Sequence, residues 1–135
     1  MKQALPLLML SLFAGMTACG TQHPADTPAT PASAAAGLAV MQEFRARGNE
    51  PFWAIDVEDD TLHYVTPEMD DGKTLQARRE DRDGVVSFSG SDGALPFTLE
   101  IRAEACEDSM SGKRFDFSAT WRYGDERMTG CAAGS

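Results

Sequence analysis

Hydrophobic and polar residues alternate along most of the chain after residue 44. A period of two places successive side chains on opposite faces of an extended backbone, so the alternation predicts strands with one buried face. A polar strand over 74–80 is expected at an edge or on an exposed wall. The apolar members of the alternating stretches are Trp53, Ile55 and Val57; Leu62 and Tyr64; Val86 and Phe88; Leu95, Phe97, Leu99, Ile101 and Ala103; and Phe115, Phe117, Ala119, Trp121 and Tyr123.

Turn dipeptides separate these stretches, and each contains a glycine that tolerates positive φ. They are Asp71-Gly72, Asp83-Gly84, Asp92-Gly93 and Gly124-Asp125. Short strands joined by such turns predict an antiparallel meander that closes into a small lipocalin-like barrel or a sandwich. The only helical signal is weak and covers Ala34 to Glu43. We therefore expect an all-β domain over 38–135.

The beginning of the chain follows a different pattern. Lys2 supplies a positive charge, and an almost unbroken apolar run from Ala4 to Ala18 ends in small residues beside Cys19. This is the organisation of a secretory signal peptide. The run is shorter than the roughly 20 apolar residues that a membrane-spanning helix requires. We predict a signal peptide over 1–18; an ordinary cleaved signal or a buried helix is the alternative.

The end of this run, Met16-Thr17-Ala18-Cys19, resembles the lipobox of bacterial lipoproteins. The resemblance implies that the signal is cut before Cys19, which is diacylated on sulfur and usually acylated on its new amino terminus. Burial of acyl chains contributes about 0.8 kcal/mol per methylene, so several chains give a stable anchor. Gly20 stands where inner-membrane members commonly have aspartate, so the resemblance favours the outer membrane, facing the periplasm.

Residues 19–37 follow as a segment rich in Thr, Pro, Ala, Ser and Gly without apolar periodicity. Such a segment buries too little apolar surface to offset the entropy of ordering. We expect a lipid-anchored flexible tether with an average reach of roughly 25 Å.

The net charge of the chain is −9, and it becomes −10 without Lys2, the only charged side chain of residues 1–18. A phosphate backbone is repelled by such a chain, so no nucleic acid partner is expected. The expected partners are the membrane, through the anchor, and a cationic protein such as lysozyme, which this charge would attract.

Three cysteines are present, and acylation of Cys19 leaves Cys106 and Cys131. In an oxidising compartment these two are expected to form a disulfide. Closing a loop of 25 residues would stabilise the fold by roughly 3.5 kcal/mol on the chain-entropy model. The alternatives are a free thiol or a metal site, although a metal site needs more ligands than two cysteines.

Two dense stretches suggest a family. They are Arg47-Gly48-Asn49-Glu50-Pro51-Phe52-Trp53, and Cys106-Glu107-Asp108-Ser109-Met110-Ser111-Gly112-Lys113-Arg114-Phe115 closing on Gly130-Cys131-Ala132. Together they resemble a family of uncharacterised bacterial envelope proteins, often lipoproteins. The resemblance implies a small all-β domain with the same disulfide, and it carries no established activity.

The first stretch is expected to place two aromatic residues, Phe52 and Trp53, at the barrel floor. Glu50 and Trp53 are the candidate floor residues, and a ligand-binding rim is the alternative.

The second stretch is expected to be a strand connection stapled by the disulfide. In the functional alternative it is an exposed loop that inserts into a partner's cleft through Glu107, Asp108, Ser111, Lys113 and Arg114. Its segment Ser111-Gly112-Lys113-Arg114-Phe115 resembles the Ser-Gly-x-x-Tyr loop of membrane-bound lysozyme inhibitors, with Phe in place of Tyr. Those inhibitors are also small, disulfide-bonded β-barrel lipoproteins, so the resemblance implies lysozyme as a partner.

No catalytic constellation is predicted. The domain has a single histidine, His63, and Ser91 lies in a hairpin turn and not in the strand-to-helix elbow of a hydrolase nucleophile. We expect no enzyme, no cofactor and no metal site, and a non-catalytic binding or structural module. A copper-handling role through thioether sulfurs and His63 is a further alternative. The methionines concerned, Met41, Met69, Met110 and Met128, are scattered without repeat.

Overall fold

The structure is a computed structural model in which residues 30–135 are described. Its helix is α1 (Pro31–Val40), and its strands are β1 (Glu43–Asn49), β2 (Phe52–Glu58), β3 (Thr61–Val65), β4 (Lys73–Gln76), β5 (Arg78–Arg82), β6 (Val85–Asp92), β7 (Leu95–Arg102), β8 (Cys106–Glu107), β9 (Arg114–Phe115), β10 (Phe117–Tyr123) and β11 (Glu126–Gly134). The predicted signal peptide, the predicted lipidation site Cys19 and the first part of the predicted tether lie outside the described residues.

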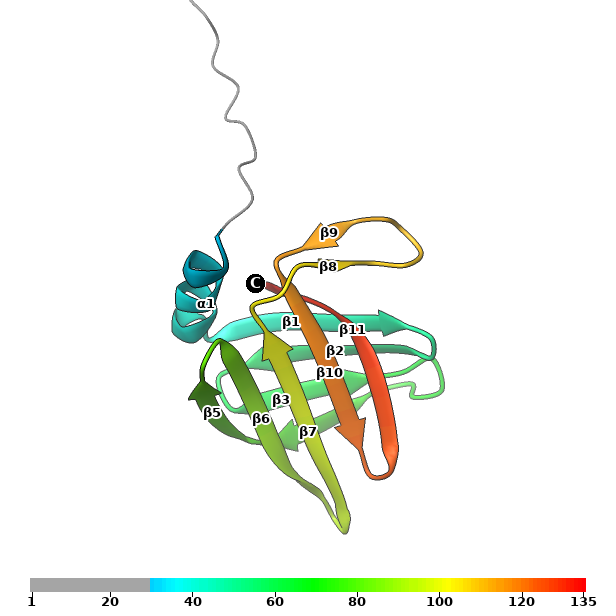
Figure 1. Cartoon of the computed structure of the whole chain (residues 1–135). Coiled ribbons are helices and arrows are strands. Elements are labelled where there is room, and N and C mark those ends of the chain that lie inside the picture. Colours follow the sequence, from blue (N-terminus) through cyan, green and yellow to red (C-terminus); the bar gives the residue numbers. More distant parts are fainter. Residues whose placement is uncertain (1–29) are drawn as a thin grey trace, which may run out of the picture.

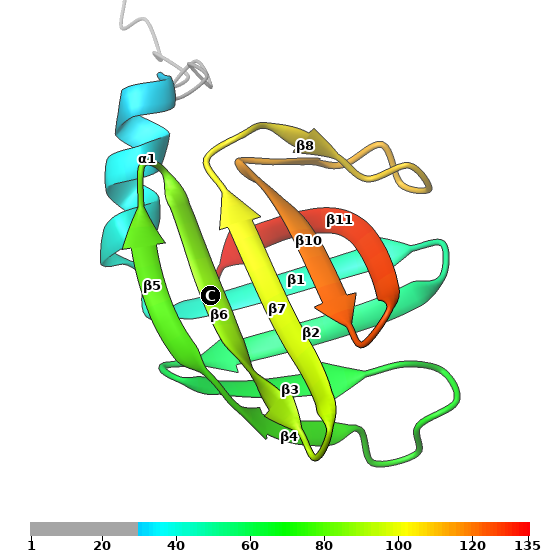
Figure 2. The ribbon, with the colours of Figure 1, turned by 60° about the horizontal axis from the view of Figure 1, so that its bottom comes forward.

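Nine strands form one antiparallel sheet in the order β4-β3-β2-β1-β11-β10-β7-β6-β5. The sheet coils until its two edge strands, β4 and β5, meet, and Ala77 joins them in the chain. The result is a nearly closed up-and-down barrel, as Figures 1 and 2 show from two directions. The short strands β8 and β9 form a separate hairpin outside the barrel. The predicted all-β barrel is confirmed, and the sandwich alternative is not adopted.

Large apolar side chains fill the barrel. In β2 every second residue is buried, namely Trp53, Ile55 and Val57, as the alternation predicts. Trp121 lies at the centre of an aromatic cluster, with ring centroids 5.1 Å from Tyr64 and 5.6 Å from Phe97. No polar or charged side chain of residues 30–135 is buried. The barrel interior is thus a hydrophobic core.

The predicted polar strand over 74–80 is divided in the structure. Its first half belongs to β4 and its second half to β5, and these are the two opposite edges of the sheet. The division occurs at Ala77, whose N–H donates to the carbonyl of Asp60 at 2.8 Å. Polarity predicted an edge position correctly, but the predicted strand forms both edge strands, β4 and β5, because the sheet closes there.

The helix α1 begins at Pro31, inside the segment predicted as a tether, and ends three residues before the predicted end at Glu43. Leu38 is fully buried in the core and Ala34 packs against it, so these two side chains join the helix to the barrel. Arg79 of β5 donates to the carbonyl of Met41 at 2.5 Å and reinforces the same contact. Within the described part of the chain, no helix is long and apolar enough to cross a bilayer.

Side chains hold the seam of the barrel, where β4 approaches β6. Lys73 of β4 contacts Asp92 of β6 at 2.5 Å and the hydroxyl of Tyr123 at 2.8 Å, and that hydroxyl donates to Asp92. The ammonium group of Lys73 lowers the pKa of Asp92. Further along β6, a Cβ on Gly90 would lie 2.6 Å from the carbonyl oxygen of Gln76. Gly90 therefore permits a backbone approach that any side chain would prevent.

We expect Gly90→Ala to destabilise the chain by about 1–3 kcal/mol, because the added methyl forces the seam apart. The same methyl would lie 2.5 Å from the ring of Phe97. Gly37→Ala in α1 is the matched control, since no atom lies within 4 Å of its added Cβ. This control should leave stability unchanged or raise it by about 0.5–1 kcal/mol. Urea denaturation midpoints measure the stability of both variants. Equal effects of the two substitutions would contradict the close approach of Gly90 to the backbone of Gln76.

Candidate functional site

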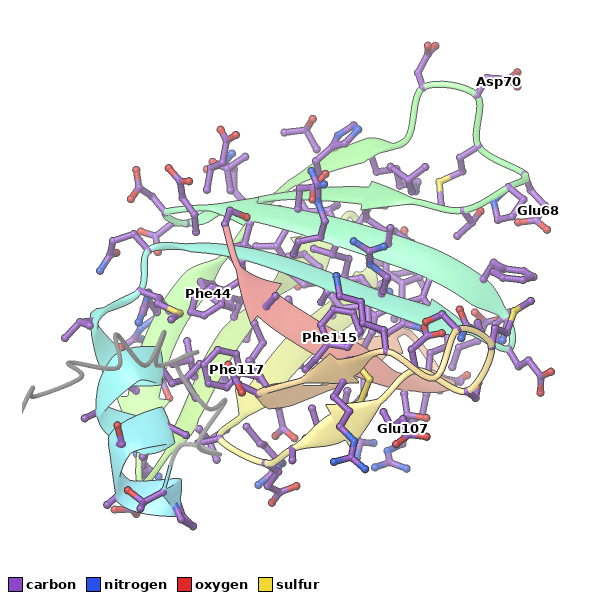
Figure 3. The ribbon with its side chains drawn as sticks, turned by 90° about the horizontal axis from the view of Figure 1, so that it is seen from above. Phe44, Glu68, Asp70, Glu107, Phe115 and Phe117 are labelled. Carbon is purple, nitrogen blue, oxygen red and sulfur yellow. A yellow bond between two sulfur atoms is a disulfide. The ribbon has the colours of Figure 1, made fainter. Side chains whose placement is uncertain are left out.

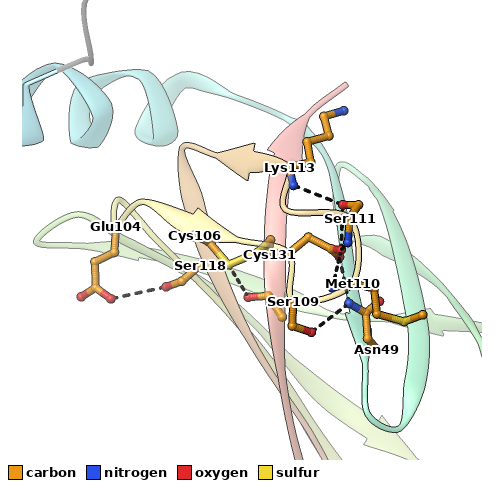
Figure 4. Close-up of a disulfide and its surroundings, with 11 residues drawn as sticks. Asn49, Glu104, Cys106, Ser109, Met110, Ser111, Lys113, Ser118 and Cys131 are labelled. Carbon is orange, nitrogen blue, oxygen red and sulfur yellow. Dashed lines mark hydrogen bonds between the residues drawn. A yellow bond between two sulfur atoms is a disulfide. The ribbon is translucent and has the colours of Figure 1, made fainter.

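The two sequence stretches that carry the family resemblance meet in the structure. The first forms the end of β1 and the turn into β2; the second forms hairpin β8–β9 with its connecting turn, residues 106–115, called the hairpin below. Asn49 joins them, because its amide nitrogen donates to Asp108 at 3.0 Å and to Ser109 at 3.3 Å (Figure 4). Two segments about sixty positions apart therefore build one surface.

The predicted disulfide is present and joins the hairpin to the barrel. Cys106 at the start of β8 is bonded to Cys131 of β11, with their Cα atoms 5.5 Å apart. Cys131 lies opposite Arg47 in the pairing of β11 with β1. The hairpin is thus fixed to the same strand pair that presents Asn49.

Asp108 organises the turn of the hairpin. Its Oδ1 accepts hydrogen bonds from the backbone N–H of Ser111 at 2.7 Å, from the Ser111 hydroxyl at 2.8 Å and from the N–H of Met110 at 3.2 Å. The turn closes with Gly112, whose φ of +67° lies in the left-handed region that glycine adopts readily. The hydrogen bonds, led by those from Ser111, lower the pKa of the Asp108 carboxyl to about 2.

The predicted loop residues thus divide into two groups. Asp108 and Ser111 are engaged within the turn, since the Ser111 hydroxyl also accepts the N–H of Lys113 at 3.2 Å. Glu107, Lys113 and Arg114 are exposed, and Glu107 and Arg114 form a solvent-exposed pair at 3.4 Å. Figure 3 shows Glu107 and Phe115 on the hairpin at the side of the barrel. The side chains of Glu107, Lys113 and Arg114 therefore do not hold the turn and face solvent.

Sequence reasoning missed Met110 and Asn49 as components of this surface. Met110 lies at the turn of the hairpin with 68 % of its surface exposed, which is unusual for a large apolar side chain. Asn49 was part of a quoted motif, but its role depends on a contact with a segment distant in sequence. The co-occurrence of the two motifs was the only signal that could have indicated this contact.

The residues predicted for the barrel floor differ in burial. Trp53 is buried, and its indole lies over Gly48, where a Cβ would come within 2.2 Å of Nε1. Phe52 is 51 % exposed, so the expectation of two buried aromatics is wrong. Glu50 is also exposed, because it lies in the turn between β1 and β2 and not inside the barrel. Alternation explains this outcome, since Phe52 and Trp53 point to opposite faces of β2.

Two grooves flank the end of β1. The junction groove, about 400 Å³, lies against the hairpin and is lined by residues 47–50, 106–109 and 129–131. The outer groove, about 560 Å³, lies on the outer face of the barrel. It is lined by Arg45, Arg47, Gly48, Asn49, Phe52, Trp53, Ala54, Asp56, Val65, Thr66 and Pro67. Residues 47–49 line both grooves, so this short segment connects them.

The residues considered for copper are spread over the molecule. Met69 and Met128 line one groove, Met110 is in the hairpin, and Met41 lies beside Gly134. His63 is exposed on β3. Among residues 30–135 there is no group of three or more His, Cys, Asp or Glu that could hold a metal ion.

Comparison of the chain with family models, with curated proteins and with solved structures finds no match. The candidate surface is therefore interpreted from its own geometry and from the motifs.

We expect the free energy of unfolding of Asp108→Asn to change less with pH in the acid range than that of wild type. The folded pKa of Asp108, about 2, lies below its ordinary value of about 3.9. The stabilisation by this carboxylate is therefore complete above about pH 4 and is lost as the pH falls towards about 2. Wild type should lose more stability over this interval than Asp108→Asn, as measured by urea denaturation.

Asp116→Asn is the control for this prediction, because Asp116 is exposed and its carboxylate makes no hydrogen bond with any described residue. It should retain the acid dependence of wild type. Parallel curves for wild type and Asp108→Asn would show that Asp108 does not hold the turn.

Proposed function

We propose that the chain is a lipid-anchored, non-catalytic binding module of the bacterial envelope that contacts a protein partner through the hairpin. The observation that supports this most directly is the combination of a fixed backbone and exposed side chains. The disulfide and the hydrogen bonds of Asp108 hold the hairpin, while Met110, Lys113 and Arg114 remain exposed. A loop that is already ordered loses little entropy when it binds.

A partner would contact the outside of the barrel, because the interior is filled with side chains. Trp121, Phe97 and Tyr64 occupy the space where a lipocalin-type barrel would hold a small molecule. The hairpin lies outside the sheet and is joined to it by the disulfide and by Asn49. These positions favour recognition of a macromolecule by the hairpin.

A lysozyme-type glycoside hydrolase is the partner that fits the charges. The net charge of −9 would attract a cationic enzyme over long distances. At short range the exposed cations Lys113 and Arg114 complement the pair of carboxylates that such enzymes use for catalysis. The resemblance of residues 111–115 to the loop of lysozyme inhibitors supports the same partner.

The anchor is tested first. Cys19→Ala should prevent acylation, because the sulfur that would carry the acyl chains is absent. In a bacterial host, wild type should sediment with membranes and incorporate radiolabelled fatty acid, whereas Cys19→Ala should incorporate none. Cys106→Ala is the control and should retain the label. Equal labelling of the two variants would exclude acylation at Cys19.

The hairpin is tested with purified chain in detergent micelles, added to cell-wall suspensions with an animal-type lysozyme. Wild type should slow lysis at micromolar concentration. Lys113→Ala and Arg114→Ala should each raise the half-inhibitory concentration by about tenfold or more, because each leaves an enzyme carboxylate without a partner. Arg82→Ala, an exposed arginine of β5, is the matched control and should behave as wild type. No slowing by wild type, or equal losses in all three variants, would overturn inhibition through the hairpin.

A further inference from the structure

The outer face of β1, β2 and β3 contains the outer groove, which the hairpin does not fill. Strand register places Arg47, Ala54 and Val65 side by side in one row across these strands. Phe52 and Asp56 are the outward-facing neighbours of Ala54 on β2. The methyl group of Ala54 thus forms the floor of a hollow between larger side chains. Its volume, about 560 Å³, lies within the roughly 300–1,000 Å³ of small-molecule pockets.

The groove contains an arginine without a partner. Arg45 contacts Asp56 at 2.5 Å, which neutralises both. The guanidinium of Arg47 makes no hydrogen bond or ion pair with any residue of 30–135. The eleven lining residues carry two cations and one carboxylate, although the chain as a whole is at −9. An unpaired guanidinium beside apolar surface is suited to a carboxylate, which it binds with two parallel hydrogen bonds.

The remaining lining residues give the outer groove apolar walls and one hydrogen-bond acceptor. Phe52 is half exposed, and Val65 and Pro67 lie in the same groove, so its walls are apolar. Asn49 uses its amide nitrogen for both of its bonds to the hairpin, which leaves its Oδ1 to accept an N–H. A ligand that combines a carboxylate, a small apolar group and an adjacent N–H matches these features. The carboxyl-terminal residue of a peptide has all three.

We propose that the outer groove binds the carboxyl terminus of a peptide. The carboxylate pairs with Arg47, the last side chain enters the hollow over Ala54, and the last N–H donates to Oδ1 of Asn49. Because Ala54 is flanked by Phe52 and Val65, the hollow takes a small apolar side chain such as that of alanine. No residue of the hairpin lines this groove and the two proposals are tested with different probes, so either proposal can fail without the other.

The probe is acetylated trialanine with a free carboxylate, compared with the same peptide ending in an amide. Both are titrated into the full chain in detergent micelles, with the alanine and valine methyl groups labelled for NMR. We expect saturable shifts of the methyl signals of Ala54 and Val65 with the carboxylate peptide and none with the amide. Equal binding of the two peptides, or no shift with either, would overturn the proposal. Inorganic phosphate that displaces the peptide at equal concentration would show an unspecific anion site and would also overturn it.

Variants locate the site. Arg47→Gln should weaken binding by about tenfold or more, because it removes a charge-assisted hydrogen bond. Ala54→Leu fills the hollow and should abolish the shifts of the Val65 methyl signals. Arg122→Gln is the matched control, since Arg122 is exposed on β10 and does not line the groove. Unchanged urea denaturation midpoints confirm that the variants fold. Arg47→Gln alters only an exposed side chain. If this variant binds the carboxylate peptide as tightly as wild type does, that result alone rejects the site.

Discussion

The close approach of β1 and β11 is the constraint on which the candidate surface depends. A Cβ on Gly130 would lie 1.9 Å from the carbonyl oxygen of Arg47, and a Cβ on Gly48 would lie 2.5 Å from that of Thr129. The backbones therefore meet at a distance that only glycine allows. This contact joins the two halves of the sheet, because β11 is the last strand of the chain and pairs with the first. It also places Cys131 opposite Arg47. The positions of the disulfide, of the hairpin and of both grooves therefore depend on this contact between β1 and β11.

Charge is distributed unevenly over this small acidic domain. Many carboxylates are exposed, yet the two that show lowered pKa values have structural partners, Lys73 and Tyr123 for Asp92 and the turn residues for Asp108. Two cations of the candidate surface, Arg47 and Lys113, are not in ion pairs with any described residue. The guanidinium of Arg47 has no partner among the described residues, and Lys113 is exposed with its ammonium group 5.1 Å from the ring of Phe115. These two cations are therefore available to a ligand, although the chain as a whole is negatively charged.

The sequence predicted the fold class and most strands because each strand buries one face, and burial is a local pattern. β11 was not predicted, since Gly130 interrupts its alternation and two successive residues, Cys131 and Ala132, are buried. That irregularity arises from the contact with β1, which local sequence does not encode. The helix α1 was indicated only weakly, because its single buried residue, Leu38, gives no periodic signal.

The candidate site was predicted only in part for the same reason. The two motifs and the disulfide could be recognised along the chain, and Lys113 and Arg114 are exposed as the functional alternative expected. The hydrogen bonds of Asn49, the exposure of Phe52 and the outer groove depend on which strands become neighbours. These features could be found only after the register was known.

Asn49 relates the two sides of this surface to each other. Its amide nitrogen faces two oxygens of the hairpin, and this arrangement determines which end of the amide remains for the outer groove. If the hairpin moved away, rotation of the amide would no longer be restrained, and the groove would lose a fixed acceptor. A ligand that uses this acceptor would in turn stabilise the position of the hairpin, because coupling between two sites is reciprocal. The hairpin and the outer groove are thus linked through one side chain, although no residue of the hairpin lines the groove.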